Sequence, residues 1–284
     1  METTRRTIPS MLRETMLPDE EFGDLYHRLV GTSNIIQKIE SHMRMCLSQQ
    51  SFNAWSLRHY SKLSESVLKR SLLFLGAPGT GKTITAKGCA DHYARTENSP
   101  VVFLEVGEPR SKFVGESSKN VKAVFDYARS IAEQRKVVLF VDEFDSVGVS
   151  RDTNQMHDDV AAMVNTLNQH MTSLQTNPNV FIIACSNLER RIDHATKRRF
   201  DFTIEFKRPD ADQRKDLLTR LLENYNFDED EIIRAAKKTK DYTQDDITRV
   251  VNLAVENAFA ENAPVTNEHL AEAIEDIKPT GEYA

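Results

Sequence analysis

The stretch Ser71–Thr83, SLLFLGAPGTGKT, leads from an apolar run through a glycine-rich turn into a helical sequence. Its glycines can adopt positive φ and bring the backbone close to an anion, and the first N–H groups of the next helix favour negative charge. Lys82 would reach the β- and γ-phosphates of a nucleotide, and Thr83 would place its hydroxyl on Mg²⁺. An ordinary strand–turn–helix corner is the alternative, but the order of strand, loop and helix favours a phosphate-binding loop.

The composition is that of an ordinary globular protein, with 39% hydrophobic and 28% charged residues among 284. The formal charge of 37 − 43 = −6 argues against a polyanionic partner such as nucleic acid, and a local basic strip that binds one is the alternative. No apolar run approaches the roughly 20 residues of a membrane span. Arg5-Arg6 lack the apolar segment of an export signal, which predicts a cytoplasmic protein without a membrane segment.

The three cysteines, Cys46, Cys89 and Cys185, are far apart and show neither a CxxC pattern nor a Cys/His ligand spacing. We therefore expect no zinc site and no disulfide framework, but small core residues in a reducing compartment.

Short apolar runs alternate with longer helical patterns between residues 71 and 206, and the runs are Leu72–Leu75, Val101–Glu105, Val137–Val141, Val180–Ala184 and Phe202–Phe206. Strands that alternate with helices imply right-handed crossovers and a parallel sheet with helices on both faces. The pattern predicts an α/β fold of the P-loop NTPase type with a five-stranded parallel sheet. Ligands bind such sheets at the carboxyl ends of the strands, where the glycine-rich loop begins.

Helical patterns alone occupy the chain after Pro209, at Ala211–Glu223, Asp228–Lys238, Thr243–Glu261 and Thr266–Ile277. Asp228 three residues before Glu231, and Thr243 three before Asp246, indicate capped helix starts. A further helix begins at Thr32 or Ser33, and another covers Trp55–Lys69. We expect an N-terminal tail at 1–24, an α/β domain at 25–208 and a small helical domain at 209–284.

The N-terminal residues 1–28 allow two interpretations. Five apolar residues fall at spacings near three and four and favour a short amphipathic helix that ends at Pro18: Ile8, Met11, Leu12, Met16 and Leu17. A partly ordered tail is the alternative.

The run Val137–Glu143 is a buried strand that ends in two adjacent carboxylates. Asp142 and Glu143 leave the strand in different directions and can therefore serve different roles. Asp142 suits a hold on Mg²⁺, and Glu143 suits the polarisation of a water aimed at the γ-phosphate. An acidic turn exposed to solvent is the alternative, but the phosphate-binding loop upstream favours catalysis.

Four motifs together resemble the AAA+ ATPase module over roughly residues 25–280: GAPGTGKT at 76–83, LFVDEFDSV at 139–147, CSN at 185–187 and RRFD at 198–201. The resemblance implies ATP and Mg²⁺ as cofactors and a small helical lid. Mg²⁺ would be held at Thr83 and Asp142. The nucleotide would contact the following residues, in addition to Asp142: Val30, Gly31, Pro78, Gly79, Thr80, Gly81, Lys82, Thr83 and Ile84.

Three further residues carry roles that the resemblance implies. Asn187 matches the polar residue that helps to place the attacking water. Arg198 and Arg199 match the arginine fingers that reach the nucleotide of a neighbouring subunit, where such a group contributes about 10³–10⁵ in rate. A solvated basic turn is the alternative for the two arginines. Fingers that act in trans imply a homo-oligomer, which we expect to be a hexamer.

The segment after the second strand resembles the central pore loop of protein-remodelling members, with a basic residue, an aromatic, an aliphatic and a glycine: Lys112, Phe113, Val114 and Gly115. A ring of aromatic side chains can grip a polypeptide through apolar contacts. The alternative is that Phe113 packs on the next helix. A second loop with Arg151 would line the same channel.

The lid departs from the family pattern, because Asp245 stands where many relatives carry a small residue or a nucleotide-sensing arginine. Arg249, one helical turn further on, could substitute.

The resemblance favours a ring ATPase that remodels or partly unfolds a protein. Short matches, including the segment 164–167 and the pair Ile192-Asp193, are similar to the HORMA-domain remodelling ATPases, a group with bacterial members in antiviral defence operons. The partner would then be a HORMA-domain protein. Two alternatives stay open: an AAA+ loader or helicase-like factor that acts on nucleic acid, and a nucleotide-switched scaffold with little turnover.

Overall fold

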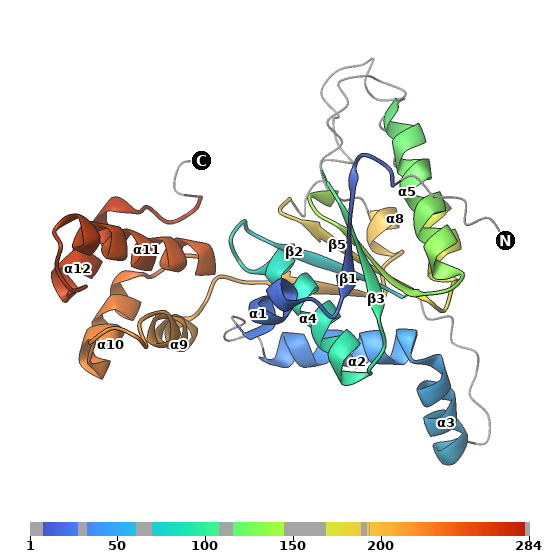
Figure 1. Ribbon diagram of the computed structural model, residues 1–284, viewed down its shortest axis with the longest axis horizontal. Helices are drawn as coiled ribbons and strands as arrows, with labels where there is room; N and C mark the ends of the chain where they lie inside the picture. Colours follow the sequence, from blue (N-terminus) through green and yellow to red (C-terminus); the bar gives the residue numbers. More distant parts are fainter. Residues whose placement is uncertain are drawn as a thin grey trace. The chain divides into compact units, whose positions relative to one another are not determined.

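The computed structural model describes residues 8–27, 33–60, 70–107, 116–144, 169–188, 192 and 194–281 (Figure 1). These residues divide into two compact units. The α/β unit comprises the described parts of 8–27, 34–75 and 83–205, and the helical unit comprises residues 33, 76–82 and 206–281. The loop Gly76–Lys82 thus groups with the helical unit, which the sequence did not indicate. The domain limits at 24 and 208 stay predictions.

A six-stranded sheet of order β1-β3-β4-β5-β2-β6 forms the centre of the fold. Its strands are β1 (Leu12–Leu17), β2 (Ser71–Gly76), β3 (Val101–Val106), β4 (Lys136–Val141), β5 (Val180–Ser186) and β6 (Phe202–Phe206). The pairs β3–β4, β4–β5 and β2–β5 are parallel. All five predicted strands are present, and the α/β class is confirmed. The apolar runs of β2, β3, β4 and β5 are buried on both faces, as parallel sheets require, whereas β6 at the edge of the sheet is largely exposed.

The sixth strand corrects the interpretation of the N-terminal segment. β1 pairs antiparallel with β3, from Leu12 opposite Val106 to Leu17 opposite Val101. The prediction of an amphipathic helix or a partly ordered tail is therefore wrong for these residues. Spacings near three and four described the apolar residues, but the unpaired edge of β3 decides the conformation by offering a full row of backbone hydrogen bonds.

Helices cover both faces of this sheet. In the α/β unit they are α1 (Glu20–His27), α2 (Ser33–Leu47), α3 (Gln49–His59), α4 (Lys82–Thr96), α5 (Glu116–Ala132) and α8 (His194–Lys197). Figure 1 shows α1, α2 and α4 on one face and α5 on the other. α2 begins at Ser33 as predicted, whereas the helix predicted at Trp55–Lys69 begins earlier, at Gln49, and ends at His59. Residues 61–69 lie outside the described part of the chain.

The helical unit contains α9 (Ala211–Leu221), α10 (Glu229–Lys238), α11 (Gln244–Ala260) and α12 (Asn267–Asp276). Both predicted capping boxes are confirmed: the Asp228 side chain accepts from the Glu231 N–H, and the Thr243 side chain accepts from the Asp246 N–H. A third box at Asp210 opens α9. The four helices enclose a small apolar core that includes Leu218, Ile247, Val250 and Leu270.

No helix among the described residues is both long enough and apolar enough to cross a membrane. All three cysteines are buried, as predicted.

Candidate functional site

The glycine-rich loop connects β2 to α4 and packs closely against other parts of the helical unit. Gly79 has φ of 74°, and a Cβ placed on it would lie 2.7 Å from Thr243 Oγ1. A Cβ on Gly76 would lie 2.3 Å from the carbonyl oxygen of Phe206. Any larger residue would clash at either position, and at Gly79 it would also be held in the left-handed region. The loop therefore needs glycine for its conformation and for its close packing.

Lys82 points back into the loop. Its Nζ donates to the carbonyl oxygens of Gly76 and Ala77, both at 2.8 Å, and only 6% of the residue is exposed. Thr80 is also buried, and its hydroxyl donates to Ala77 at 2.8 Å. The ammonium group is thus held within the loop by backbone acceptors, in reach of an anion bound to the loop's N–H groups.

Thr83 and Asp142 come from different elements, 59 residues apart, and meet directly. Thr83 is the second residue of α4, and Asp142 follows the last residue of β4. The Thr83 hydroxyl donates to Asp142 Oδ2 at 2.8 Å. A hydroxyl and a carboxylate are the hard oxygen ligands that Mg²⁺ takes from proteins. The pair predicted from sequence to hold Mg²⁺ therefore fits that ion.

Glu143 has an unusual backbone. Its φ is 47°, in the left-handed region, although it is not glycine, and its N–H donates to Asp142 Oδ1 at 2.9 Å. A non-glycine residue held there costs on the order of 1 kcal/mol, and such residues are concentrated at functional sites. Glu143 is exposed and Asp142 is half-buried.

Asn187 follows β5, the strand between β2 and β4. The parallel registers place Leu75 beside Ser186 and Val141 beside Ala184, so the three strands end at the same edge. A residue directly after β5 therefore lies at the edge of the sheet where β2 and β4 also end. Sequence order alone could not give this neighbourhood.

The two predicted finger residues differ in how they are held. The Arg199 carbonyl oxygen accepts from Ser71 Oγ at 3.3 Å and from Gln175 Nε2 at 3.0 Å. Arg199 Nη1 also donates to Thr172 Oγ1 at 2.7 Å. Arg198 is exposed, whereas Arg199 is half-buried. No motif in the sequence indicated that Ser71 or Gln175 supports this segment.

The start of α11 contacts the glycine-rich loop. The Asp245 N–H donates to the Gly79 carbonyl oxygen at 3.1 Å. Arg249, the predicted substitute for a lid arginine, has a side chain that is 57% exposed, and its Nη1 lies 3.9 Å from Asp246 Oδ1. Asp246 is fully buried. Burial raises its pKa, but hydrogen bonds from Thr280 and Thr243 outweigh this effect, so the pKa of Asp246 lies below its ordinary value.

Several predicted residues lie outside the described part of the chain, so their roles stay predictions: Val30, Gly31, Lys112, Phe113, Val114, Gly115 and Arg151.

Residues 72–208 match the family model described as "ATPase family associated with various cellular activities (AAA)". This match covers slightly less than half of the chain, and it agrees with the fold and the loop in its resemblance to the AAA ATPase family. A Methanothermobacter thermautotrophicus protein described as a putative 26S proteasome regulatory subunit homolog is 31% identical over 216 residues, 75% of this chain and 56% of the relative. The chain thus spans little more than half of that relative's length.

Two other similar proteins match over nearly their whole length. The CD-NTase-associated protein 6 of Escherichia coli is 28% identical over 281 residues, 93% of this chain and 94% of the relative. A chain of the solved E. coli MS115-1 HORMA:CdnC:Trip13 complex aligns with a TM-score of 0.86 and 23% identity, covering 97% of this chain and 98% of that one. At this identity, the structural likeness establishes a shared fold.

Proposed function

We propose that this protein hydrolyses ATP with Mg²⁺ in a homo-hexameric ring and uses the energy to remodel a protein substrate. The observation that carries the proposal is the Thr83–Asp142 hydrogen bond, because it joins the phosphate-binding loop to the acidic end of β4. A strand–turn–helix corner with no catalytic role would not need the Thr83 hydroxyl to contact the Asp142 carboxylate directly after a buried lysine, Lys82.

Each residue of the site has a defined task in this reaction. Lys82 exchanges its carbonyl partners for the β- and γ-phosphate oxygens, and the loop's N–H groups hold the remaining phosphate charge. Thr83 and Asp142 would hold Mg²⁺, and a bound ion would supply positive charge to offset that of the phosphate oxygens. Glu143 accepts a proton from the attacking water, and Asn187 orients that water.

Arg198 and Arg199 complete the site of the next subunit around the ring. Their guanidinium groups stabilise the charge that develops in the transition state. The Arg198 side chain is exposed, and the Arg199 carbonyl oxygen is held by two hydrogen bonds. A fixed backbone with an exposed guanidinium group is suited to contact a neighbouring subunit. An isolated subunit would therefore hydrolyse ATP slowly.

We propose a HORMA-domain protein as the substrate, gripped by the aromatic residue Phe113 in the central pore. Two similarities support this choice. The E. coli structure with a TM-score of 0.86 contains a HORMA protein, and the E. coli CD-NTase-associated protein 6 matches over 94% of its length. The same two similarities support the role in antiviral defence that the sequence resemblance predicts.

The Glu143→Gln variant tests the whole proposal. We expect kcat for ATP to fall about 10²–10⁴-fold, the range for the loss of a general base, while ATP affinity and ring formation persist. The matched control, Lys82→Ala, should lose ATP affinity itself. Steady-state ATPase assays, nucleotide binding and analytical ultracentrifugation separate the two results.

The same variant also tests the substrate. The ATP-bound Glu143→Gln ring should retain a closed HORMA protein, whereas the wild-type protein should release it in an opened form. ATPase activity that responds to DNA and is indifferent to HORMA proteins would instead favour the nucleic-acid class. A wild-type monomer with full turnover would contradict the ring.

A further inference from the structure

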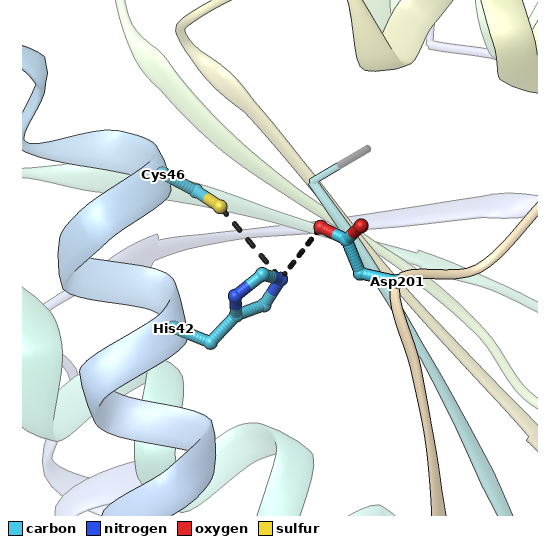
Figure 2. A group of neighbouring side chains, drawn as sticks. All are labelled: His42, Cys46 and Asp201. Atoms are coloured by element: carbon cyan, nitrogen blue, oxygen red, sulfur yellow. Dashed lines mark hydrogen bonds and ion pairs between the residues drawn. The ribbon is translucent and has the colours of Figure 1, made fainter. Parts of the chain in front are cut away.

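A buried hydrogen-bonded cluster connects α2 to the segment that carries the two arginines (Figure 2). His42 and Cys46 lie one turn apart on α2, and both face Asp201. His42 Nε2 lies 3.1 Å from Asp201 Oδ2 and 3.7 Å from Cys46 Sγ. The His42 side chain is 4% exposed and that of Asp201 18% exposed. Asp201 stands only two residues after Arg199, so α2 is bound to the base of the finger segment.

The finger segment has a second attachment through its backbone. The Asp201 N–H donates to the Ser71 carbonyl oxygen at 3.0 Å, and the Arg199 carbonyl oxygen accepts from Ser71 and Gln175. These bonds fix the segment to β2 and to the helical turn at residues 169–175. Because these hydrogen bonds all lie along one side of the segment, the segment could still rotate about the line that they form. The His42–Asp201 contact adds a side-chain anchor, which limits this rotation.

The surroundings make His42 a neutral donor. Burial lowers its pKa and the Arg70 charge adds to this effect, while the Asp201 carboxylate opposes it, and the net direction is downward. Burial also raises the pKa of the Cys46 thiol to about 12, so that group is uncharged. The rings of Phe181 and Phe202 approach the imidazole edge to face, with centroids at 5.6 and 4.9 Å. At neutral pH, Nε2–H therefore donates to Asp201 in an apolar setting. Removal of either partner there would leave a buried polar group without a hydrogen bond, which destabilises the fold.

We propose that His42 is a positioning residue for the arginine fingers: through Asp201 it sets the orientation in which Arg198 and Arg199 meet the neighbouring subunit's nucleotide. This inference rests on the proposed function, because it assumes that the fingers act in trans. It goes beyond that function by assigning a task to α2, which begins two residues after the predicted adenine-side residue Gly31. Through His42, α2 contacts Asp201 at the base of the segment that carries the two arginines.

Imidazole, thiol and carboxylate are also donors for zinc. Two features favour the hydrogen-bonded anchor. Nε2 and Asp201 are already paired at hydrogen-bond distance, and the nearby Arg70 charge opposes a second cation. Zinc bound at one ion per chain, lost in both His42→Ala and Cys46→Ser, would overturn the proposal.

The variants His42→Ala and His42→Gln test the anchor. We expect His42→Ala to lower kcat about 10- to 100-fold, the scale of a misplaced catalytic group, with ATP affinity unchanged within about twofold. His42→Gln keeps an N–H donor and should recover most of the rate. Cys46→Ser is the matched control from the same helix face and should keep the wild-type rate. An equal loss in His42→Ala and His42→Gln would overturn the role of the hydrogen bond.

Mixed rings distinguish positioning in trans from a fold defect. Glu143→Gln subunits cannot hydrolyse ATP themselves but carry intact fingers, so mixing them with His42→Ala subunits should raise the turnover per active His42→Ala site. An unchanged turnover per site would overturn the proposal, because the defect would then lie in the subunit's own site or fold. Absence of ATPase activity in the wild-type ring would refute the proposed function itself, which is a different result.

Discussion

The α/β unit and the helical unit are each stabilised internally by a different kind of interaction. The α/β unit depends on burial: residues such as Phe103, Phe140 and Phe181 lie fully inside, on strands whose neighbours are distant in sequence. The helical unit depends more on local signals, with a capping box at the start of three of its helices, α9, α10 and α11. The comparison teaches that a fold can combine a core fixed by tertiary contacts with a unit whose helices are specified residue by residue.

The largest expected effect breaks the core of the α/β unit. Phe140→Ala removes a fully buried ring that lies 5.7 Å from the Phe103 ring, and it should lower the free energy of unfolding by about 3–5 kcal/mol. Phe259→Ala is the matched control, because that ring on α11 is 85% exposed. Denaturant titration of both variants checks the difference. Equal losses would contradict the burial argument.

Gly79→Ala should have the next largest effect. The new Cβ would be forced into positive φ and within 2.7 Å of Thr243 Oγ1, at a cost of about 1–3 kcal/mol. The loop and the start of α11 would both have to shift, so ATP affinity should fall together with the melting temperature. Isothermal titration and thermal unfolding measure the two. Wild-type affinity in this variant would mean that the loop conformation is not required.

Asp246→Asn tests the helical unit, where we expect hydrogen bonds to one carboxylate to contribute to stability. The Asp246 carboxylate accepts from Thr243 N–H at 2.9 Å and from Thr280 N–H and Oγ1 at 2.9 and 2.6 Å, so losing an acceptor should cost about 1–3 kcal/mol. The pKa of Asp246 is lowered by folding, so its contribution is complete above the unfolded value near 3.8 and is lost as pH falls below it.

The check is the pH dependence of the free energy of unfolding. The variant should lose less stability than the wild type on acidification through that range. Glu256→Gln, an exposed position on α11, is the control and should keep the wild-type slope. An unchanged slope in Asp246→Asn would contradict the assignment.

Arg249→Ala should have the smallest effect. Its side chain is 57% exposed and 3.9 Å from Asp246, which predicts a contribution of at most about 0.5 kcal/mol. ATP affinity should stay within about twofold of wild type. A loss of tenfold or more in a titration with ATP would identify Arg249 as the nucleotide-sensing arginine of the lid.

Local signals allowed much of the structure to be predicted from the sequence. The apolar runs gave all five strands, and the Asp228 and Thr243 caps gave helix starts to within a residue. β1 was missed because the conformation of an edge strand depends on the strand it pairs with, here β3. The spacing of the apolar residues in β1 also fits a helix. The His42–Asp201 pair was missed for a related reason. His42 and Cys46 share one helix face, but their partner Asp201 lies 159 residues after His42 in the sequence, and only the fold brings them together.

The sequence by itself determined the chemistry of this protein: a glycine-rich loop with Lys82 and Thr83, a strand that ends in Asp142 and Glu143, and an arginine pair. These features follow from residue types at short spacings in the sequence, which do not depend on tertiary contacts. Only the tertiary structure decided that Thr83 and Asp142 share a hydrogen bond, that Asn187 follows β5 at the edge of the sheet where β2 and β4 also end, and that α2 anchors Asp201. Such meetings depend on strand order and on the burial of distant residues, which no local pattern specifies.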